Sequence, residues 1–489
     1  MSVISGIVFV PWIIHNVGDS EYAIYTLTMS IIGIVVFDFG FGNAVTRYIV
    51  KYVSENDQAS ANKVGGIAFR VYLIIDILLT ILFIILFYNV ENIYKELTLS
   101  EILKFKTIFI IAASYSIISF PFIFINGVLS AYEKFILLKS VILLQRLLII
   151  ALTFVALYMD YGVISLVLVN SLVGILAVIA KLLILKKKTP LKINILSKSS
   201  TLGKKLLVFS SWFAVILISQ RMIFNLTPSI LGVFSGTHEI TLFGISSSIE
   251  GYFYMIASVI NGLFLPKIMR IIKNDTNNDK KELTRVMIKV GRIQLIIFMF
   301  LFTGFLLVGQ EFITLWLGTS YHRVYLIIII LVIPSFLYLP QFIGNTAILA
   351  LNKVKFQGIV FLIMAIVNII LASIFSIRWG ATGAALAICI SYIIRSIGLN
   401  IIFSKIINID LRKFFVGAYL PMILPTFVVV GISLVLFKLI VLNNQIIYVF
   451  LTKGIIYTLI FTFIFFLFVL NKSEKKIIST VFYKFKSSS

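Results

Sequence analysis

Seven ionisable side chains interrupt the long apolar stretches of this sequence, and they are its main candidates for chemistry. A charge at the centre of a membrane helix costs about 2.5–3.5 kcal/mol on insertion scales, so each needs a reason to be there. They are Asp38, Asp76, Arg146, Arg221, Glu250, Arg395 and Lys453. Guanidinium groups bind phosphate through two parallel hydrogen bonds, whereas buried carboxylates relay protons or cations. The set therefore indicates a pathway for an anionic substrate.

The first candidate for an anion anchor is Arg221, because Asn225 lies one turn further on the same helical face. The alternative interpretation is a buried ion pair between Arg221 and Glu250 that ties two helices together. Arg395, in the middle of a later apolar run, is expected to line the same substrate cavity. Few polar residues share the helical face of Arg146, so a role in the cavity and a structural role are equally open for it.

Three carboxylates are candidates for ion coupling or gating. Glu250 belongs to a polar stripe at helical spacing, which should face a wet cavity or another helix. The stripe contains Ser246, Ser247, Glu250, Tyr254 and Asn261. Tyr254 is therefore expected to line the cavity, and Glu250 either binds a coupling proton or sodium ion or holds Arg221 in place. Asp76 is a second coupling candidate, and Asp38 is expected to form a helix-end or gate ion pair.

The sequence contains no signature of metal, nucleotide or disulfide chemistry. Its one cysteine, Cys389, lies in an apolar run, and none of its three histidines has a partner at metal-ligand spacing. No phosphate-binding loop, serine-hydrolase elbow or zinc-protease motif occurs. We therefore expect neither an enzyme nor an ATP-driven pump, and no cofactor other than a coupling proton or sodium ion.

Composition places these residues in a membrane protein. Of the 489 residues, 60% are hydrophobic and 12% are charged, and the mean hydropathy is +1.10. Soluble domains contain about 45–50% apolar and about 25% charged residues. The net charge of +23 does not indicate nucleic acid as a partner, because Lys and Arg lie in short loops between apolar runs. We expect an all-α, polytopic membrane protein.

About fourteen apolar stretches approach the ~20 residues that a helix needs to cross a bilayer. They are residues 1–15, 22–43, 66–90, 107–131, 137–158, 162–185, 206–231, 240–265, 290–308, 325–350, 356–376, 383–404, 414–437 and 446–470. Lys453 lies near the end of its stretch, so snorkelling to the membrane interface explains it at least as well as a functional role.

The distribution of basic residues predicts the orientation. With the N-terminus in the cytoplasm, the cytoplasmic loops and tail contain 31 Lys and Arg residues, and the outer loops contain six. The loops 181–205 and 267–292 are the most basic of the cytoplasmic ones. Because cytoplasmic loops are enriched in Lys and Arg, both termini are expected on the cytoplasmic side of a bacterial inner membrane.

The two halves of the sequence match at an offset of 218 or 219 residues. Gly18 aligns with Gly236, Glu21 with Glu239, Pro121 with Pro340, Asn126 with Asn345, Lys134 with Lys353 and Gly162 with Gly380. A six-helix unit repeated in one orientation predicts two bundles related by a pseudo-two-fold axis along the membrane normal. The predicted parts are an N-terminal lobe 1–190, a basic cytoplasmic linker 191–205, a second lobe 206–405, an extra helix pair 406–472 and a basic cytoplasmic tail 473–489.

Several short motifs resemble those of a known transporter family. Residues 18–22 (GDSEY), 38–42 (DFGFG) and 47–48 (RY) resemble the opening of bacterial polysaccharide flippases of the Wzx type. Residues 126–135 (NGVLSAYEKF) resemble the fourth loop of those proteins. The resemblance covers essentially the whole chain and implies membership of the multidrug, oligosaccharidyl-lipid and polysaccharide exporter superfamily.

The resemblance implies a flippase for undecaprenyl-diphosphate-linked oligosaccharide repeat units. Such a protein moves its substrate across the inner membrane by alternating access, for O-antigen, lipopolysaccharide or other surface polysaccharide assembly. The implied partners are the lipid-linked substrate, membrane lipid, and a polysaccharide polymerase with other assembly proteins. The alternative is a multidrug or cation antiporter of the same superfamily, although cationic residues slightly outnumber carboxylates within the apolar stretches. A membrane scaffold for glycosyltransferases needs no charges at these positions.

Overall fold

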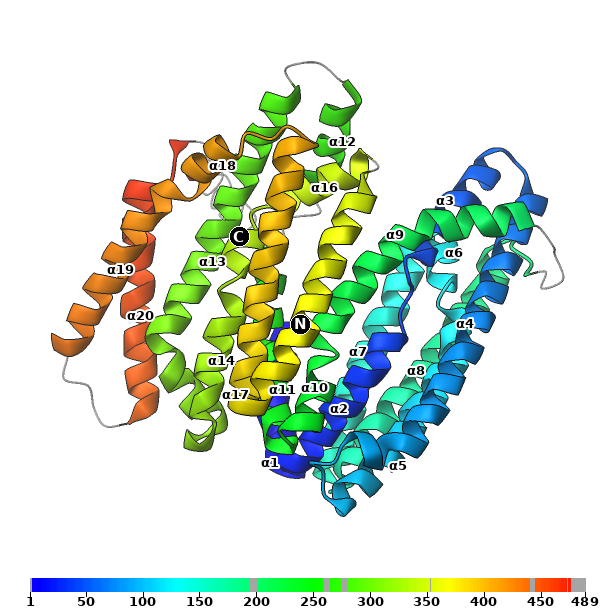
Figure 1. The fold of residues 1–489 in the computed structure, drawn as a ribbon, viewed down its shortest axis with the longest axis horizontal. Helices are drawn as coiled ribbons and strands as arrows, with labels where there is room; N and C mark the ends of the chain where they lie inside the picture. The colour runs from blue at the N-terminus through cyan, green and yellow to red at the C-terminus, as the bar shows by residue number, and fades with distance from the viewer. Residues whose placement is uncertain are drawn as a thin grey trace, which may run out of the picture. The chain divides into compact units, whose positions relative to one another are not determined.

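The structure is a computed structural model, described at residues 2–193, 200–258, 264–274, 279–351, 353–439, 445–472 and 474–475. These residues are helical apart from short connections (Figure 1). The helices are α1 (Ser2–Val17), α2 (Asp19–Val35), α3 (Phe41–Ser54), α4 (Gln58–Ile93), α5 (Leu99–Ser119), α6 (Ile125–Ala131), α7 (Phe135–Tyr158), α8 (Gly162–Lys188), α9 (Ser200–Phe224), α10 (Thr227–Phe234), α11 (Thr237–Ser258), α12 (Leu265–Asn274), α13 (Asp279–Leu317), α14 (His322–Val332), α15 (Ser335–Tyr338), α16 (Phe342–Ala350), α17 (Val354–Lys405), α18 (Leu411–Ala418), α19 (Leu420–Leu439) and α20 (Ile446–Ile464). A π-helical turn, η4 (Phe465–Val469), follows α20.

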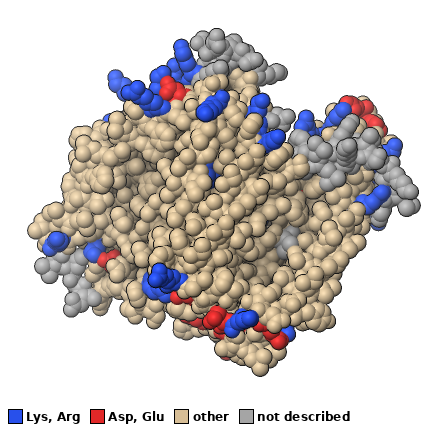
Figure 2. Space-filling model, viewed as in Figure 1, with Lys and Arg blue, Asp and Glu red and all other residues tan. Residues whose placement is uncertain are grey.

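The prediction of an all-α, multi-pass membrane protein is confirmed. Within the described ranges, ten helices are long and apolar enough to cross a membrane. The number fourteen stays a prediction: α1 and α2 have only 16 and 17 residues, and the 52-residue α17 counts once although Gly380 kinks it. On the face drawn in Figure 2 the charged side chains gather mainly at the ends of the helices, and the surface between them is almost entirely uncharged. Many large hydrophobic side chains of the long helices are exposed. That surface suits contact with lipid chains.

The chain forms two compact units. Unit 1 comprises Met1–Ile245 and Val354–Ser391, and unit 2 comprises Ser246–Lys353 and Tyr392–Ser489. In unit 1, α3 packs on α4 and α6 around the fully buried rings of Tyr72, Phe120 and Phe124. In unit 2, α13 is the central helix, because α14, α16, α18, α19 and α20 all pack on it. Each unit therefore has its own helical core.

Proline and glycine break several predicted spans into pieces. The span predicted at 22–43 is interrupted between α2 and α3, where Phe39 and Gly40 have φ of 45° and 77°. Such positive φ angles end a helix, and glycine adopts them without steric cost. The span predicted at 107–131 bends at Pro121, and the one at 325–350 breaks beside Pro334 and Pro340. The apolar stretches predicted where the long helices lie, but not where these helices break.

Positions related by the sequence repeat have matching backbone conformations. Gly18 and Gly236 both have φ of 82°, immediately before α2 and α11. Gly162 and Gly380 have φ of 64° and 54°, and Lys134 and Lys353 are the N-caps of α7 and α17. Six residues at corresponding positions thus start or interrupt helices in the same way, although the side chains around them differ.

Two segments predicted to be loops are at least partly helical. The segment 267–292 contains most of α12 and the first part of α13, so Arg292, which we expected in a cytoplasmic loop, is a helical residue. Amphipathic helices can be too polar on one face to register as apolar runs, which explains the error. The linker 191–205 contains the start of α9 at Ser200, and its residues 194–199 lie outside the described part. Of the tail 473–489, only residues 474 and 475 are described.

Candidate functional site

The first candidate cluster lies in unit 1, where α9 ends and α10 begins. Arg221 is in the last turn of α9, where a cation interacts favourably with the helix dipole. Asn225 follows in the break, and its Nδ2 lies 2.5 Å from where a Cβ on Gly33 of α2 would stand. A larger residue at this position would force the Asn225 side chain to shift. The Arg221 side chain is exposed, and its guanidinium carbon lies 5.7 Å from the Phe37 ring centroid. The predicted pair, Arg221 and Asn225, therefore stands together against α2.

Asp38 directly follows Phe37, whose ring lies beside Arg221. We expected Asp38 to lie inside a helix, but it does not. It stands in the break between α2 and α3, and its carboxylate accepts hydrogen bonds from the Gly42 N–H at 2.9 and 3.1 Å. The Tyr72 hydroxyl also donates to its Oδ1. Asp38 therefore satisfies an orphan N–H group at the start of α3, as an N-terminal capping residue does. Sequence reasoning missed Tyr72 as its partner.

Asp76 of α4 is 8% exposed. Tyr72 and Thr80 lie one turn on either side of it in α4. The Tyr72 hydroxyl donates to Asp38, and the Thr80 hydroxyl donates to the main-chain oxygen of Asp76. Within the described ranges, its Oδ1 has no hydrogen-bond partner. A role for Asp76 in ion coupling stays a prediction.

The second candidate cluster lies in unit 2 and is built around Arg395. This side chain is 5% exposed, and its guanidinium carbon lies 4.5 Å from the ring centroids of both Tyr338 and Tyr392. The two rings are 5.3 Å apart. Stacking on aromatic faces suits the planar, weakly hydrated guanidinium group. The donors of Arg395 lie in the plane of the group, at its edge, so this arrangement fixes the direction in which it can bind an anion.

Tyr338 joins Arg395 to two of the other predicted residues. Its hydroxyl donates to Glu250 Oε1 at 3.2 Å and accepts from the Ser335 hydroxyl at 3.0 Å. Glu250 is 7% exposed, and the Tyr254 ring lies 6.1 Å from that of Tyr338. Glu250, Tyr254 and Arg395 thus lie together around Tyr338, a residue that we missed. Pro334 and Pro340 flank Tyr338 in the sequence. They were the one indication that this segment is irregular and could be functional.

Two of the in-span cations lie elsewhere. Arg146 is on the exposed side of α7, beside the exposed Leu143 and Leu147, and the structure brings it into neither cluster. Lys453 of α20 forms an ion pair with Glu311 of α13, and its Nζ lies 5.4 Å from the Phe437 ring. An ion pair between helices explains Lys453 better than the snorkelling that we considered. Arg221 and Glu250 belong to different units, so their pairing stays a prediction.

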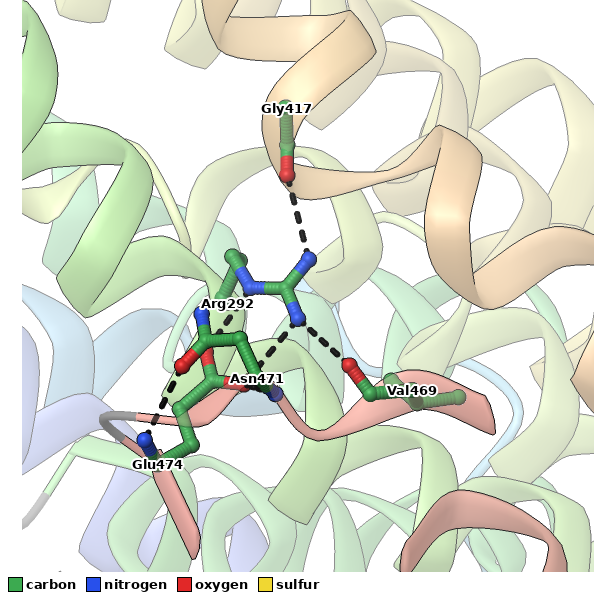
Figure 3. A network of polar contacts seen from close by, with 5 residues as sticks. All are labelled: Arg292, Gly417, Val469, Asn471 and Glu474. Carbon is green, nitrogen blue, oxygen red and sulfur yellow. Dashed lines mark hydrogen bonds and ion pairs between the residues drawn. The ribbon is translucent and has the colours of Figure 1, made fainter. Parts of the chain in front are cut away.

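A polar network in unit 2 was missed entirely. Arg292 donates from Nε and Nη2 to the carboxylate of Glu474, at 2.8 and 3.0 Å, and from Nη2 and Nη1 to the main-chain oxygens of Val469 and Gly417, at 2.7 and 3.2 Å (Figure 3). Asn471 and Glu474 also bond each other's main-chain N–H groups. The network ties the end of η4 to α13 and α18. It is a structural anchor of the C-terminal helices.

Comparison with protein families identifies the chain. The family described as polysaccharide biosynthesis protein matches residues 1–272, which is more than half of the 489 residues. The chain belongs to the polysaccharide biosynthesis protein family. No sequence among the curated proteins matches this family member. The predicted family resemblance is confirmed at this level.

Solved structures show which fold this polysaccharide biosynthesis protein has. An inward closed conformation of the lipid II flippase MurJ is similar over 94% of this chain and 95% of its own, with 16% identity and a TM-score of 0.73. An inward-facing multidrug resistance MATE family transporter of the MOP superfamily is similar over 82% and 93%, with 13% identity and a TM-score of 0.64. A MOP superfamily transporter from Pyrococcus furiosus has 14% identity over 82% and 90%, with a TM-score of 0.56. The fold of this chain is therefore similar to that of these transporters.

Proposed function

We propose that this protein translocates undecaprenyl-diphosphate-linked oligosaccharide repeat units across the inner membrane, for O-antigen, lipopolysaccharide or other surface polysaccharide assembly. Membership of the polysaccharide biosynthesis family and the likeness in fold to the lipid II flippase support the proposal. Alternating access, in which the substrate is exposed to the two sides in turn, is the mechanism expected of repeat-built transporters. A coupling proton or sodium ion is expected to bind at a carboxylate such as Glu250 or Asp76.

The observation on which the proposal chiefly rests is the buried guanidinium of Arg395 between Tyr338 and Tyr392. A diphosphate presents planar pairs of oxygens that a guanidinium edge binds through two parallel hydrogen bonds. Aromatic rings stacked beside it suit the apolar faces of sugar rings. Arg221 with Asn225 supplies a second guanidinium and amide pair. We assign the substrate diphosphate and sugars to these residues and to Tyr254, and keep Arg146 as a further candidate.

The duplicated architecture is part of this proposal. Lobes 1–190 and 206–405 are proposed as two six-helix bundles related by a pseudo-two-fold axis, with 191–205 as linker, 406–472 as an extra helix pair and 473–489 as tail. The equal φ angles of Gly18 and Gly236 and the similar ones of Gly162 and Gly380 support it. The 31 basic residues assigned to one side favour cytoplasmic termini. A polymerase and other assembly proteins are the proposed protein partners.

Reconstitution of the purified full chain tests the function. Vesicles would contain a fluorescent undecaprenyl-diphosphate-linked oligosaccharide, and a lectin or glycosidase added outside would report the fraction exposed on the outer leaflet over time. Faster exchange than in protein-free vesicles, abolished by Arg395→Ala, is the expected result. Equal rates with and without the protein would reject the proposal.

The alternative is a multidrug or cation antiporter, and the buried carboxylates of Asp76 and Glu250 are the observation that favours it. A cationic drug would need such carboxylates in its binding site. Vesicles loaded with a fluorescent organic cation and given a proton or sodium gradient separate the two functions. Gradient-driven cation efflux, without exchange of the lipid-linked sugar, would favour the antiporter.

A further inference from the structure

An apolar pocket of about 490 Å³ lies within unit 1, between α2, α4 and α10. Its walls are hydrocarbon side chains: Ile31 and Ile34 of α2, Leu82 and Leu86 of α4, and Ile230 and Val233 of α10. Among the described residues that line it, only Tyr94 and Ser229 are polar. The volume lies within the range of ~300–1,000 Å³ that small-molecule sites occupy. The pocket can therefore hold a chain of carbon atoms but offers almost nothing to a polar ligand.

The pocket lies beside the first cluster, and part of its lining is exposed at the molecular surface. Ile34 directly follows Gly33, which Asn225 touches, and the lining residue Leu226 directly follows Asn225. Arg221 and Asn225 therefore stand at one end of the pocket. Leu82 and Phe234, both lining residues, are 40% exposed, so a chain can enter from the bilayer. Along α4 the lining runs from Leu82 to Ile93, a rise of roughly 16 Å at 1.5 Å per residue.

Apolar walls alone select no occupant inside a membrane. Lipid chains are as apolar as leucine, so moving a chain from the bilayer into the pocket gains little hydrophobic free energy. Two properties then distinguish one lipid from another here: the head group that the end of the pocket can bind, and the number of chains, because a single pocket of about 490 Å³ suits one hydrocarbon chain better than two. The exposed guanidinium of Arg221 with the Asn225 amide favours a phosphate head group of net negative charge over a zwitterionic one.

From this juxtaposition we infer that the pocket binds the polyprenyl chain of the lipid carrier while Arg221 and Asn225 bind the phosphate attached to that chain. The inference rests on the proposed function and adds to it the place where the hydrocarbon part of the substrate lies. Binding in the pocket holds the start of the chain inside unit 1. The rest of a long polyprenyl chain stays in the bilayer. Only an amphipathic ligand with a phosphate at one end fills both parts of this site.

The test is photolabelling of the full chain in phosphatidylcholine vesicles. The probe is undecaprenyl phosphate with a diazirine near the phosphate end of its chain, and labelled peptides are identified by mass spectrometry. We expect label within residues 31–34, 82–94 or 226–234. Unlabelled undecaprenyl phosphate should compete, whereas dioleoyl phosphatidic acid, which has the same phosphate head on acyl chains, should not. Equal competition by both lipids, or label spread over all lipid-facing helices, would overturn the inference.

A matched pair of variants locates the label independently. Val233→Trp fills the pocket, and Val435→Trp makes the same change on the exposed side of α19, where Val435 is 57% exposed. Labelling should fall about tenfold in Val233→Trp, which corresponds to about 1.4 kcal/mol of binding, and should be unchanged in Val435→Trp. Unchanged labelling in Val233→Trp would also reject the inference. If the wild type moves the lipid-linked sugar but is labelled elsewhere, the inference about the pocket fails and the proposed function stands. If the pocket is labelled but no transport is seen, the pocket binds the lipid and the proposed function fails.

Discussion

Arg292 and Glu474, 182 positions apart in the sequence, form a buried ion pair with two hydrogen bonds of 2.8 and 3.0 Å. The guanidinium also donates to the main-chain oxygens of Gly417 and Val469, so one side chain joins α13, α18 and η4 (Figure 3). A buried charge with all its partners in place is stable, but the same charge without its partner is costly. The attachment of the C-terminal helices to the core of unit 2 therefore depends on both residues.

Removing one member of this pair should destabilise the protein strongly. Arg292→Ala strands the Glu474 carboxylate, and Glu474→Ala strands the guanidinium, each at a cost of about 3–5 kcal/mol. Thermal unfolding of the detergent-purified protein measures the loss. The double variant Arg292→Met with Glu474→Leu leaves no buried charge and should recover most of the midpoint. A double variant as unstable as the single ones would show that geometry, not charge, explains the effect.

Two substitutions at Tyr338 separate its hydrogen bond from its stacking. Tyr338→Phe removes the donor to Glu250 but keeps the ring on Arg395, and should cost about 1–3 kcal/mol because Glu250 loses a partner. Tyr338→Leu also removes the stacked ring and should cost about 0.5–2 kcal/mol more. Unfolding midpoints and the flipping assay would be measured on the same preparations. Equal stability of the two variants would contradict a stacking role for the ring.

The sequence predicted the helices better than the contacts between them. Long apolar runs predict where helices cross the membrane, and glycines at a constant offset indicated the repeat. Asp38 was placed in a helix, because hydropathy does not register a break at two residues with positive φ. Tyr338 and Glu474 escaped notice because their partners, Glu250 and Arg292, are 88 and 182 positions away. Nothing in local periodicity encodes such pairs, so the members of each cluster could be predicted only in part.

The N-cap of α18 should make the stability of this helix pH-dependent. Asp410 Oδ2 lies 2.8 Å from the Nζ of Lys413, and Asp410 Oδ1 accepts a hydrogen bond from the Lys413 main-chain N–H at 3.0 Å. These two bonds hold the pKa of Asp410 below its usual value. The carboxylate is then stabilised in the folded state, so its contribution is present above the unfolded pKa of about 3.9 and is lost as pH falls through the lower folded value. Asp410→Asn keeps an accepting oxygen without a charge. Unfolding midpoints below pH 5 should depend less on pH in this variant than in the wild type, and identical slopes would contradict the assignment.

The two repeat-related glycines offer a matched test of backbone strain. Gly380 has φ of 54°, and a Cβ there would collide with the Glu239 carboxylate, which also accepts the Ala381 N–H at 2.7 Å. Gly162 has φ of 64°, but its Cβ would meet only Glu21 Oε2, at an ordinary 3.8 Å. Both alanine variants should lose about 1–3 kcal/mol to strain, with Gly380→Ala losing more because of the collision. Unfolding midpoints of the two variants decide this, and a larger loss at Gly162 would refute the local geometry.

The role of Arg221 is decided by comparing transport with protein level. If it binds the diphosphate, Arg221→Ala should abolish transport while the protein stays inserted and folded. Arg221→Lys keeps the charge but loses the planar fork, so it should slow transport roughly tenfold to a hundredfold, since a hydrogen bond to a charged group contributes about 1.5–3 kcal/mol. Arg378→Ala, at an exposed arginine outside both clusters, is the control and should leave transport intact.

The alternative, that Arg221 only pairs with Glu250, makes a different forecast for the same preparations. Each single change, Arg221→Ala or Glu250→Gln, would then strand the other residue and lower the amount of folded protein. The double variant would restore both level and transport. Under our proposal the Arg221→Ala protein is already folded, and the double variant still does not transport, because the group that binds the phosphate is missing. Surface polysaccharide and protein abundance, measured together for the single and double variants, distinguish the two, and full rescue by the double variant would falsify the role of Arg221 in binding phosphate.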